Sequence, residues 1–230
     1  MSGVGLLFVG VVLFVNGLNS IGVVPARSAA FLNIVVGAFQ IVFPTLVLLQ
    51  SPGDTAVLAA TWPNYLFGVT YLWFGLGVYL NLEPQGFGWY SSFVAVIALY
   101  QAVLAAPVDP IFSVIWFTWA VMWTLFFLVL ALGRSSLGTF AGWFLILLGL
   151  PTCSLVAILQ FQGIWSTEIW TAALALLLLV VLAGVAFFAA RVTDARAAAR
   201  TTGARAADAA TVRSHPSPEA QVSREALVAN

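Results

Sequence analysis

Seven apolar blocks follow one another along the first 190 residues of the chain, separated by short links of turn and cap residues. Because an α-helix rises about 1.5 Å per residue, about 20 residues cross the hydrocarbon layer of a bilayer. Each block has that length. We expect transmembrane helices at residues 4–22, 28–50, 63–81, 88–106, 111–132, 138–161 and 168–190. Pro44 and Pro151 lie inside the second and sixth blocks and are expected to kink these helices.

The composition excludes a water-soluble fold. Of the 230 residues, 62% are hydrophobic and only 7% are charged. A soluble core of this size could not cover that much apolar surface. Because the backbone must bond to itself inside lipid, we predict an all-α integral membrane protein.

Residue types that carry much of enzyme chemistry are scarce in the sequence. The chain has no Lys, which excludes a retinal Schiff base. Its single cysteine, Cys153, excludes an intrachain disulfide and a multi-thiolate metal site. The only histidine, His215, lies in the polar tail, so a Ser/His/Asp arrangement has no support. We therefore expect neither an enzyme nor a bound metal or cofactor.

Charged residues indicate how the chain crosses the membrane. Within residues 1–190 they fall only in links or at block ends: Arg27, Asp54, Glu83, Asp109, Arg134 and Glu168. With seven spans, Arg27, Arg134 and the Arg-rich tail share one side. Because basic residues concentrate on the cytoplasmic side, we expect a cell-membrane protein with an outside N-terminus and a cytoplasmic C-terminus. The tail is expected to extend the last helix briefly and to be disordered beyond Gly203.

Three tryptophans in the fifth block share one helix face. Trp116, Trp119 and Trp123 are spaced at i, i+3 and i+7. Tryptophan usually marks the ends of a span, where its N–H reaches the headgroups. Here the indoles lie at membrane depth, and each N–H needs an internal partner. The face is either core packing or the wall of a narrow path.

The absence of charges inside the blocks favours a neutral solute on any such path. An ion at membrane depth needs counter-charges or rings of carbonyls, whereas a small neutral molecule needs an aromatic slot and a few hydrogen-bonding groups. Candidates for these groups are Asn16, Asn33, Gln40, Thr70, Tyr71, Thr118 and Thr152. The same residues could instead bond one helix to another, and both roles remain open.

Six short motifs mark the chain up to about residue 165. They are Gly3-x-x-Leu6-Leu7-Phe8-Val9-Gly10 with Asn16-Gly17, Arg27-Ser28-Ala29 with Asn33, Phe67-Gly68-Val69-Thr70-Tyr71-Leu72, Trp89-Tyr90-Ser91-Ser92-Phe93, Trp116-x-x-Trp119-x-x-x-Trp123 and Leu137-Gly138-x-Phe140. In this order they resemble the AmiS/UreI family of urea and short-chain amide channels.

The resemblance implies a six-helix channel bundle over residues 1–165, with a solute path through each protomer of a homo-hexamer and an outside N-terminus. Residues 166–190 would add a transmembrane helix, and residues 191–230 a largely disordered cytoplasmic tail. Two aromatic and aliphatic constrictions, carried over residue by residue, would be formed by Leu6, Leu13, Val69, Trp73, Trp119 and Trp123. Asn16, Thr70, Tyr71 and Trp116 would line or support the path.

Three departures separate the chain from the acid-gated urea channel of that family. That channel has a long, His-rich loop where residues 51–62 form a short link without His, so we expect no acid gating. Leu148 aligns with a carboxylate and Val69 with a bulky aromatic, which favours a wider and less polar path. We therefore predict a passive channel for urea and short-chain aliphatic amides, nearer to the amide-transport branch. The alternative is a non-conducting membrane scaffold or accessory subunit whose tryptophan face serves packing alone.

Overall fold

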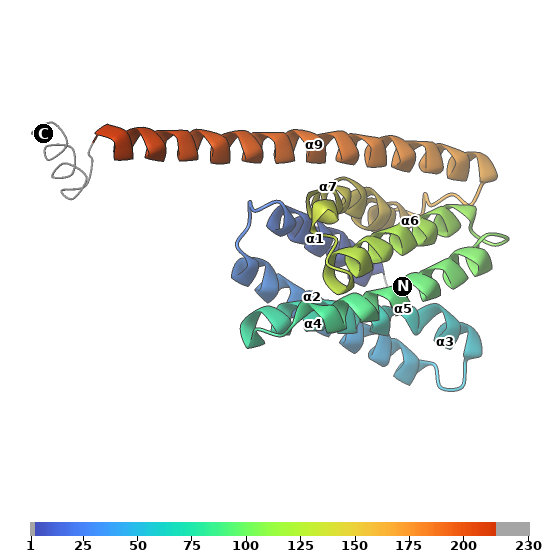
Figure 1. The fold of residues 1–230 in the computed structure, drawn as a ribbon. Coiled ribbons are helices and arrows are strands. Elements are labelled where there is room, and N and C mark those ends of the chain that lie inside the picture. Colours follow the sequence, from blue (N-terminus) through green and yellow to red (C-terminus); the bar gives the residue numbers. More distant parts are fainter. Residues whose placement is uncertain (1–2, 215–230) are drawn as a thin grey trace, which may run out of the picture. The chain divides into compact units, whose positions relative to one another are not determined.

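The computed structural model describes residues 3–214, with side chains for residues 3–205. All its elements are helical (Figure 1). In chain order they are α1 (Gly3–Ser20), α2 (Ala26–Gln50), α3 (Thr55–Thr61), α4 (Pro63–Leu80), α5 (Pro84–Ala105), α6 (Pro110–Phe126), the π-helix η1 (Phe127–Ala131), the 3₁₀-helix η2 (Ser135–Leu137), α7 (Gly138–Gly149), the π-helix η3 (Leu150–Ser154), α8 (Leu155–Phe161) and α9 (Ile169–Ser214).

The seven predicted spans are all helices. The fifth span is α6 continued by η1, and the sixth is α7, η3 and α8 in succession. Within residues 3–214, six helical segments are long and apolar enough to cross a membrane. The span outside that group is α4, whose Asn64, Thr70 and Tyr71 face the protein interior and lower its mean hydropathy. The all-helical membrane fold is therefore confirmed.

Short links separate the helices, and several helices begin with residues that favour helix initiation. Proline occupies the first turn of α4, α5 and α6, where its missing N–H removes no helix bond. The Asp109 carboxylate caps α6, accepting a hydrogen bond from the backbone N–H of Phe112 at 3.0 Å. Its other oxygen accepts from the indole N–H of Trp165 at 2.8 Å. One carboxylate thus joins the start of the tryptophan helix to the link before α9.

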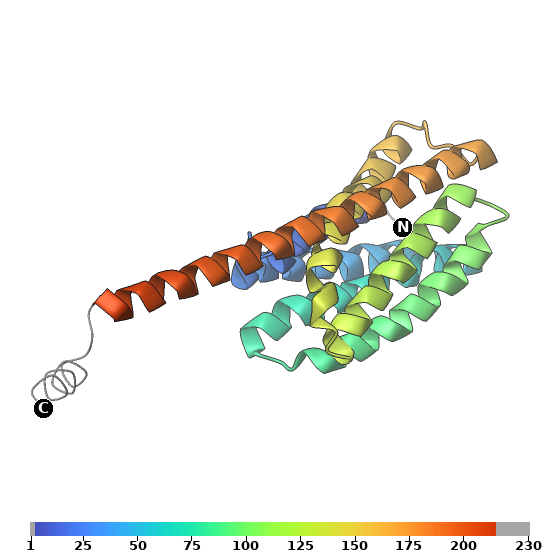
Figure 2. The ribbon, with the colours of Figure 1, turned by 45° about the horizontal axis from the view of Figure 1, so that its top comes forward.

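Three helix pairs build the bundle (Figure 2). Each pair is antiparallel: α1 with the α7–η3–α8 span, α2 with α4, and α5 with α6. The first pair is close because Gly3, Gly10 and Gly17 of α1 lie against Phe161, Ser154 and Gly142, respectively. This small-residue stripe therefore serves contacts within one protomer.

The last helix continues further than the sequence predicted. Its apolar part packs on the bundle through Ala172, Leu179 and Ala186, and the Phe187 ring lies edge-on to Phe140. Beyond Ala190 the chain forms a separate unit, whose described part is helical to Ser214. The helix thus extends past Gly203, and Ala and Arg, which are frequent in this segment, are strong helix formers. Residues 215–230 lie outside the described part.

We predict that Gly17→Ala destabilises the bundle by about 1–3 kcal/mol, since added carbon in a tight contact forces the neighbours apart. A Cβ at this position would lie 2.6 Å from the Gly142 carbonyl oxygen and 2.9 Å from the Ile146 backbone nitrogen. Gly184→Ala in α9 is the matched control, because no atom lies within 4 Å of its added Cβ. Thermal unfolding of both variants in detergent checks this, and an unchanged Gly17→Ala midpoint would contradict it.

Candidate functional site

The tryptophan face of α6 meets a single ring from α4 at the centre of the bundle. Phe67 stacks on Trp116 with ring centroids 5.7 Å apart, and on Trp123 at 6.3 Å. It meets Trp119 edge-on at 5.5 Å. Trp116 and Trp119 are themselves edge-on at 4.9 Å. We call Phe67, Trp116, Trp119 and Trp123 the ring cluster.

A π-helix positions the second tryptophan of the cluster. Pro151 lacks a backbone N–H, and around it the sixth span forms η3 instead of a regular α-helix. This turn carries Thr152, whose hydroxyl donates to the Leu148 carbonyl at 2.6 Å. The same oxygen accepts from the indole N–H of Trp119 at 3.1 Å. Trp119 thus has the internal partner that its depth demands.

The indole N–H of Trp123 differs from that of Trp119, which bonds to Thr152. The side chain is 1% exposed, and its Nε1 has no hydrogen-bond partner in the described part of the chain. Trp123 also lines a small cavity of about 20 Å³. A cavity needs roughly 10–15 Å³ to hold one water molecule, so there is room for about one. The described residues thus provide no acceptor for this buried donor.

Polar side chains from three helices surround that cavity. Its walls are Leu13, Asn16, Ser20, Asn33, Thr70, Tyr71, Phe74, Phe87, Trp123 and Phe126. The Asn16 and Asn33 amides bond reciprocally, at 2.9 Å and 2.6 Å between nitrogen and oxygen, and so join α1 to α2. Thr70 donates to the carbonyl of Leu66 on its own helix. Only the Asn16–Asn33 pair both joins two helices and lines the cavity, since the Ser20 and Thr70 hydroxyls bond within their own helices.

The structure places the predicted constriction residues in different surroundings. Leu6 and Leu13 are buried in the core with the ring cluster, and Leu13 also lines the cavity. Val69 is 40% exposed in the single chain. It follows Phe67 by two residues and therefore points to nearly the opposite face of α4. The geometry thus does not bring Val69 to the tryptophan pair, and Phe67 lies there instead.

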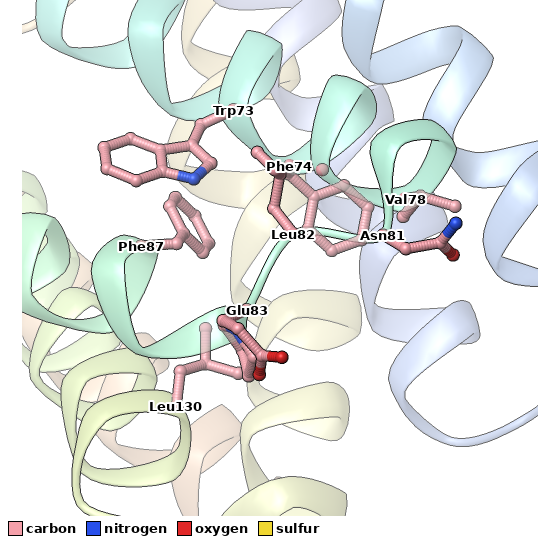
Figure 3. Close-up of a pocket in the computed structure, with 10 residues that line it drawn as sticks. Trp73, Phe74, Val78, Asn81, Leu82, Glu83, Phe87 and Leu130 are labelled. Carbon is pink, nitrogen blue, oxygen red and sulfur yellow. The ribbon is translucent and has the colours of Figure 1, made fainter.

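Trp73 lines a second, larger pocket rather than the ring cluster. Figure 3 shows its indole beside Phe87, with Glu83 and Leu130 on the far side. The ring centroids of Trp73 and Phe87 are 6.2 Å apart, and the pocket measures about 320 Å³. It lies beside the link from α4 to α5, and we call it the vestibule. Phe74 and Phe87 line both spaces and so separate them.

Sequence reasoning missed Phe67, Phe74 and Phe87 as site residues. The helical period held the signal for two of them, since Phe67, Tyr71 and Phe74 share one face of α4 at i, i+4 and i+7. The residue-by-residue carry-over from the family resemblance instead favoured Val69 and Trp73, which lie off that face. Phe87 had no such signal, because only the packing of α5 on α4 and η1 brings it to the cavity.

The bundle and its lining define a class of protein. A polytopic helical bundle encloses a hydrogen-bonding cavity, a ring cluster and a vestibule, and no charged side chain lines the cavity or the cluster. These are the parts of a membrane transporter or channel for small molecules.

Comparison with known proteins identifies the family. The model of the AmiS/UreI family transporters matches residues 1–164, and the chain belongs to this family. It is accordingly a transporter and not an enzyme. The chain is 52% identical over 169 residues to AmiS2 of Rhodococcus erythropolis, assigned as a transporter, covering 73% of this chain and 82% of that protein. It is 43% identical to an amidate substrates transporter protein of Mycolicibacterium smegmatis, covering 73% and 79%.

A solved structure shows the same fold. The crystal structure of the Helicobacter pylori urea channel superposes with a TM-score of 0.66 at 30% identity. The match covers 72% of this chain and all of that one. The family match ends at residue 164, so α9 lies outside it.

We predict that Thr152→Val destabilises the bundle by about 1–3 kcal/mol, because it leaves the buried Trp119 N–H without its acceptor. Valine keeps the side-chain shape. Thr124→Val on α6 is the control, since that hydroxyl bonds only to its own helix, at the Ala120 carbonyl. Thermal unfolding and near-ultraviolet circular dichroism check this. Equal midpoints for the two variants would show that the Trp119–Thr152 bond contributes nothing to stability.

Proposed function

We propose that the protein is a passive channel for urea and short-chain aliphatic amides, with one path through each protomer. The path runs past the ring cluster, through the cavity beside Trp123 and into the vestibule beside Trp73. Leu6, Leu13, Trp119 and Trp123 constrict it, together with Phe67. Asn16, Thr70, Tyr71 and Trp116 line or support it.

The unpartnered indole N–H of Trp123, next to a polar cavity, is the observation that carries this proposal. A group that only packs would be satisfied internally, because an unpaired buried donor costs about 1–3 kcal/mol. This cost is offset when the carbonyl of a permeating solute accepts a hydrogen bond from the Trp123 N–H. Flat aromatic faces beside it supply dispersion contacts for a planar molecule.

Neutral solutes suit this path and ions do not. The cluster and cavity offer amide, hydroxyl and indole groups. These replace the few hydrogen bonds that a urea or an amide leaves behind in water, but they cannot replace the hydration of a charge. The 52% and 43% identities to amide-type transporters favour amides over urea alone.

The assembly and orientation are part of the same proposal. The family resemblance supports a homo-hexamer, and the many exposed apolar side chains of α2, α5 and α9 leave room for both lipid and neighbouring protomers. The positions of Arg27 and Arg134 support an outside N-terminus. The start of α1 and the ring cluster then face outward, and the vestibule faces the cytoplasm.

The direct test is light-scattering swelling of liposomes that contain the purified protein, with urea and acetamide as solutes. Influx is expected to exceed that of empty liposomes. Trp123→Phe keeps a ring but removes the N–H, so influx is expected to fall about fivefold, the value of one hydrogen bond. Trp89→Phe is the control, because Trp89 is 59% exposed on the surface of α5.

The outcomes separate the proposal from its alternative. Wild-type influx equal to that of empty liposomes would establish the non-conducting scaffold or accessory subunit. If the wild-type protein conducts and Trp123→Phe conducts at the same rate, the protein is a channel but the indole N–H has no role in conduction.

Influx is also expected to vary little between external pH 5 and 8. Histidine is the side chain that ordinarily titrates in this range, and residues 1–214 contain none. Swelling assays at fixed internal pH and stepped external pH check this. A steep increase in influx on acidification would show that another group gates the channel.

A further inference from the structure

The cavity beside Trp123 and the vestibule differ greatly in size and share two lining residues. The cavity measures about 20 Å³ and the vestibule about 320 Å³. The cavity has room for about one water molecule, whereas the vestibule is as large as many small-molecule binding pockets. Phe74 of α4 and Phe87 of α5 line both spaces, and Figure 3 shows them from the vestibule. The change in width between the two spaces therefore falls at these two rings.

The rings of Phe74 and Phe87 are in contact where the two spaces adjoin. Their centroids lie 6.5 Å apart, with an angle of 60° between the ring planes. This separation is within the range of about 4.5–7 Å that is usual for aromatic pairs in contact. A solute that moves between the vestibule and the cavity must therefore displace at least one of the two rings.

Close backbone contacts hold the two helix segments that carry these rings. In each case the next residue is a glycine packed against another element. A Cβ on Gly75 would lie 2.7 Å from the Ala30 carbonyl oxygen of α2, and a Cβ on Gly88 would lie 2.9 Å from the Ala131 Cα of η1. Backbones this close leave no room for α4 or α5 to move against these partners. The passage therefore opens by rotation of a side chain and not by a shift of a helix.

The two rings differ in how freely they can rotate. Phe87 is 7% exposed and lies against the rings of Trp73, at 6.2 Å, and Phe126, at 6.4 Å, as well as against Phe74. Phe74 is half-buried, and within residues 3–205 its ring pairs with that of Phe87 alone. A space for about one water molecule cannot accept a phenyl ring, so the Phe74 ring can turn only into the vestibule. Phe74 is thus the movable ring and Phe87 the fixed one.

We infer that Phe74 sets the width of the amides that the protein conducts, as a ring gate that closes against Phe87. This inference rests on the proposed function and deepens it, because it names the class of amides admitted: those that are unbranched beside the carbonyl carbon. A narrow amide such as acetamide passes after a small rotation of the Phe74 ring. A branched amide needs a larger rotation, which breaks more of the contacts between the two rings.

The test compares acetamide with isobutyramide in the liposome swelling assay, after subtraction of the rates in empty liposomes. Both solutes have the same amide group, but isobutyramide is branched beside it. Phe74→Leu is expected to raise the ratio of isobutyramide influx to acetamide influx about fivefold, because it relieves the crowding of the branched carbon. Phe74→Trp is expected to lower the ratio by a similar factor. Phe31→Leu is the control and should keep the wild-type ratio, because Phe31 is 67% exposed on α2.

Two outcomes would overturn the ring gate while leaving the channel intact. One is the wild-type ratio in both Phe74 variants, and the other is an equal loss of both solutes in Phe74→Leu, which indicates a structural role. If the wild-type protein excludes isobutyramide, its influx through Phe74→Leu decides: it exceeds that of empty liposomes or the gate is wrong. Wild-type acetamide influx at the level of empty liposomes would instead contradict the channel, and the gate with it.

The roles of the two rings can also be told apart. Phe87→Leu is expected to raise the ratio as well, but to lower the thermal unfolding midpoint more than Phe74→Leu, because Phe87 contacts three other rings. An equal or larger loss in Phe74→Leu would contradict the assignment of Phe74 as the movable ring. If Phe74→Leu does not elute as a folded protein from size exclusion in detergent, Phe74→Met replaces it, because methionine fills irregular space. The same rise in the ratio is then expected, and the wild-type ratio would contradict the gate.

Discussion

The contact of Phe67 with the three tryptophans of α6 organises the centre of this protein. It requires α4 to lie close to the bundle axis, which the glycines between α2 and α4 permit: a Cβ on Gly68 would come within 3.2 Å of the Gly37 carbonyl oxygen. It also requires a rigid tryptophan face, and the Thr152 hydroxyl holds Trp119 from the opposite span. Close backbones and one hydrogen bond thus set the geometry of four aromatic rings.

Hydrogen-bond satisfaction distinguishes structural polar groups from those that can serve a solute. Inside a bilayer each polar group needs a partner, and most have one here: Asn16 with Asn33, and Trp119 with Thr152. Among the fully buried side-chain nitrogen and oxygen atoms of the described residues, the exceptions are Gln40 Nε2, Asn64 Oδ1 and Trp123 Nε1. All three belong to side chains on the inward faces of α2, α4 and α6. Of the three side chains, only that of Trp123 lines the cavity.

Much of this architecture could be predicted from the sequence, because apolar block length and charge position determine spans directly. The tryptophan face followed from the helical period alone. The partner of that face did not, because Phe67 and Val69 both lie in one motif and only the rotation of α4 distinguishes them. Asn64 was overlooked for a similar reason: next to Pro63, at the start of a helix, it has the pattern of a cap residue. The helical extension of α9 to Ser214 agrees with the local helix propensity of its Ala and Arg residues.

The narrowness of the path bears on how selectivity arises. A cavity of about 20 Å³ beside Trp123 cannot hold an acetamide without movement of its walls. Half of the lining residues are aromatic, with two side-chain torsions each, so the cavity would open by rotation of these rings rather than by compression of the helices. A solute is admitted only if its contacts offset the ring–ring contacts that it displaces. On the proposed path, a planar amide would recover dispersion energy from the ring faces and a hydrogen bond from the unpaired Trp123 N–H, whereas a hydrated ion would recover neither. Under the proposed function, selection for neutral planar solutes therefore follows from the packing itself and requires no charged filter.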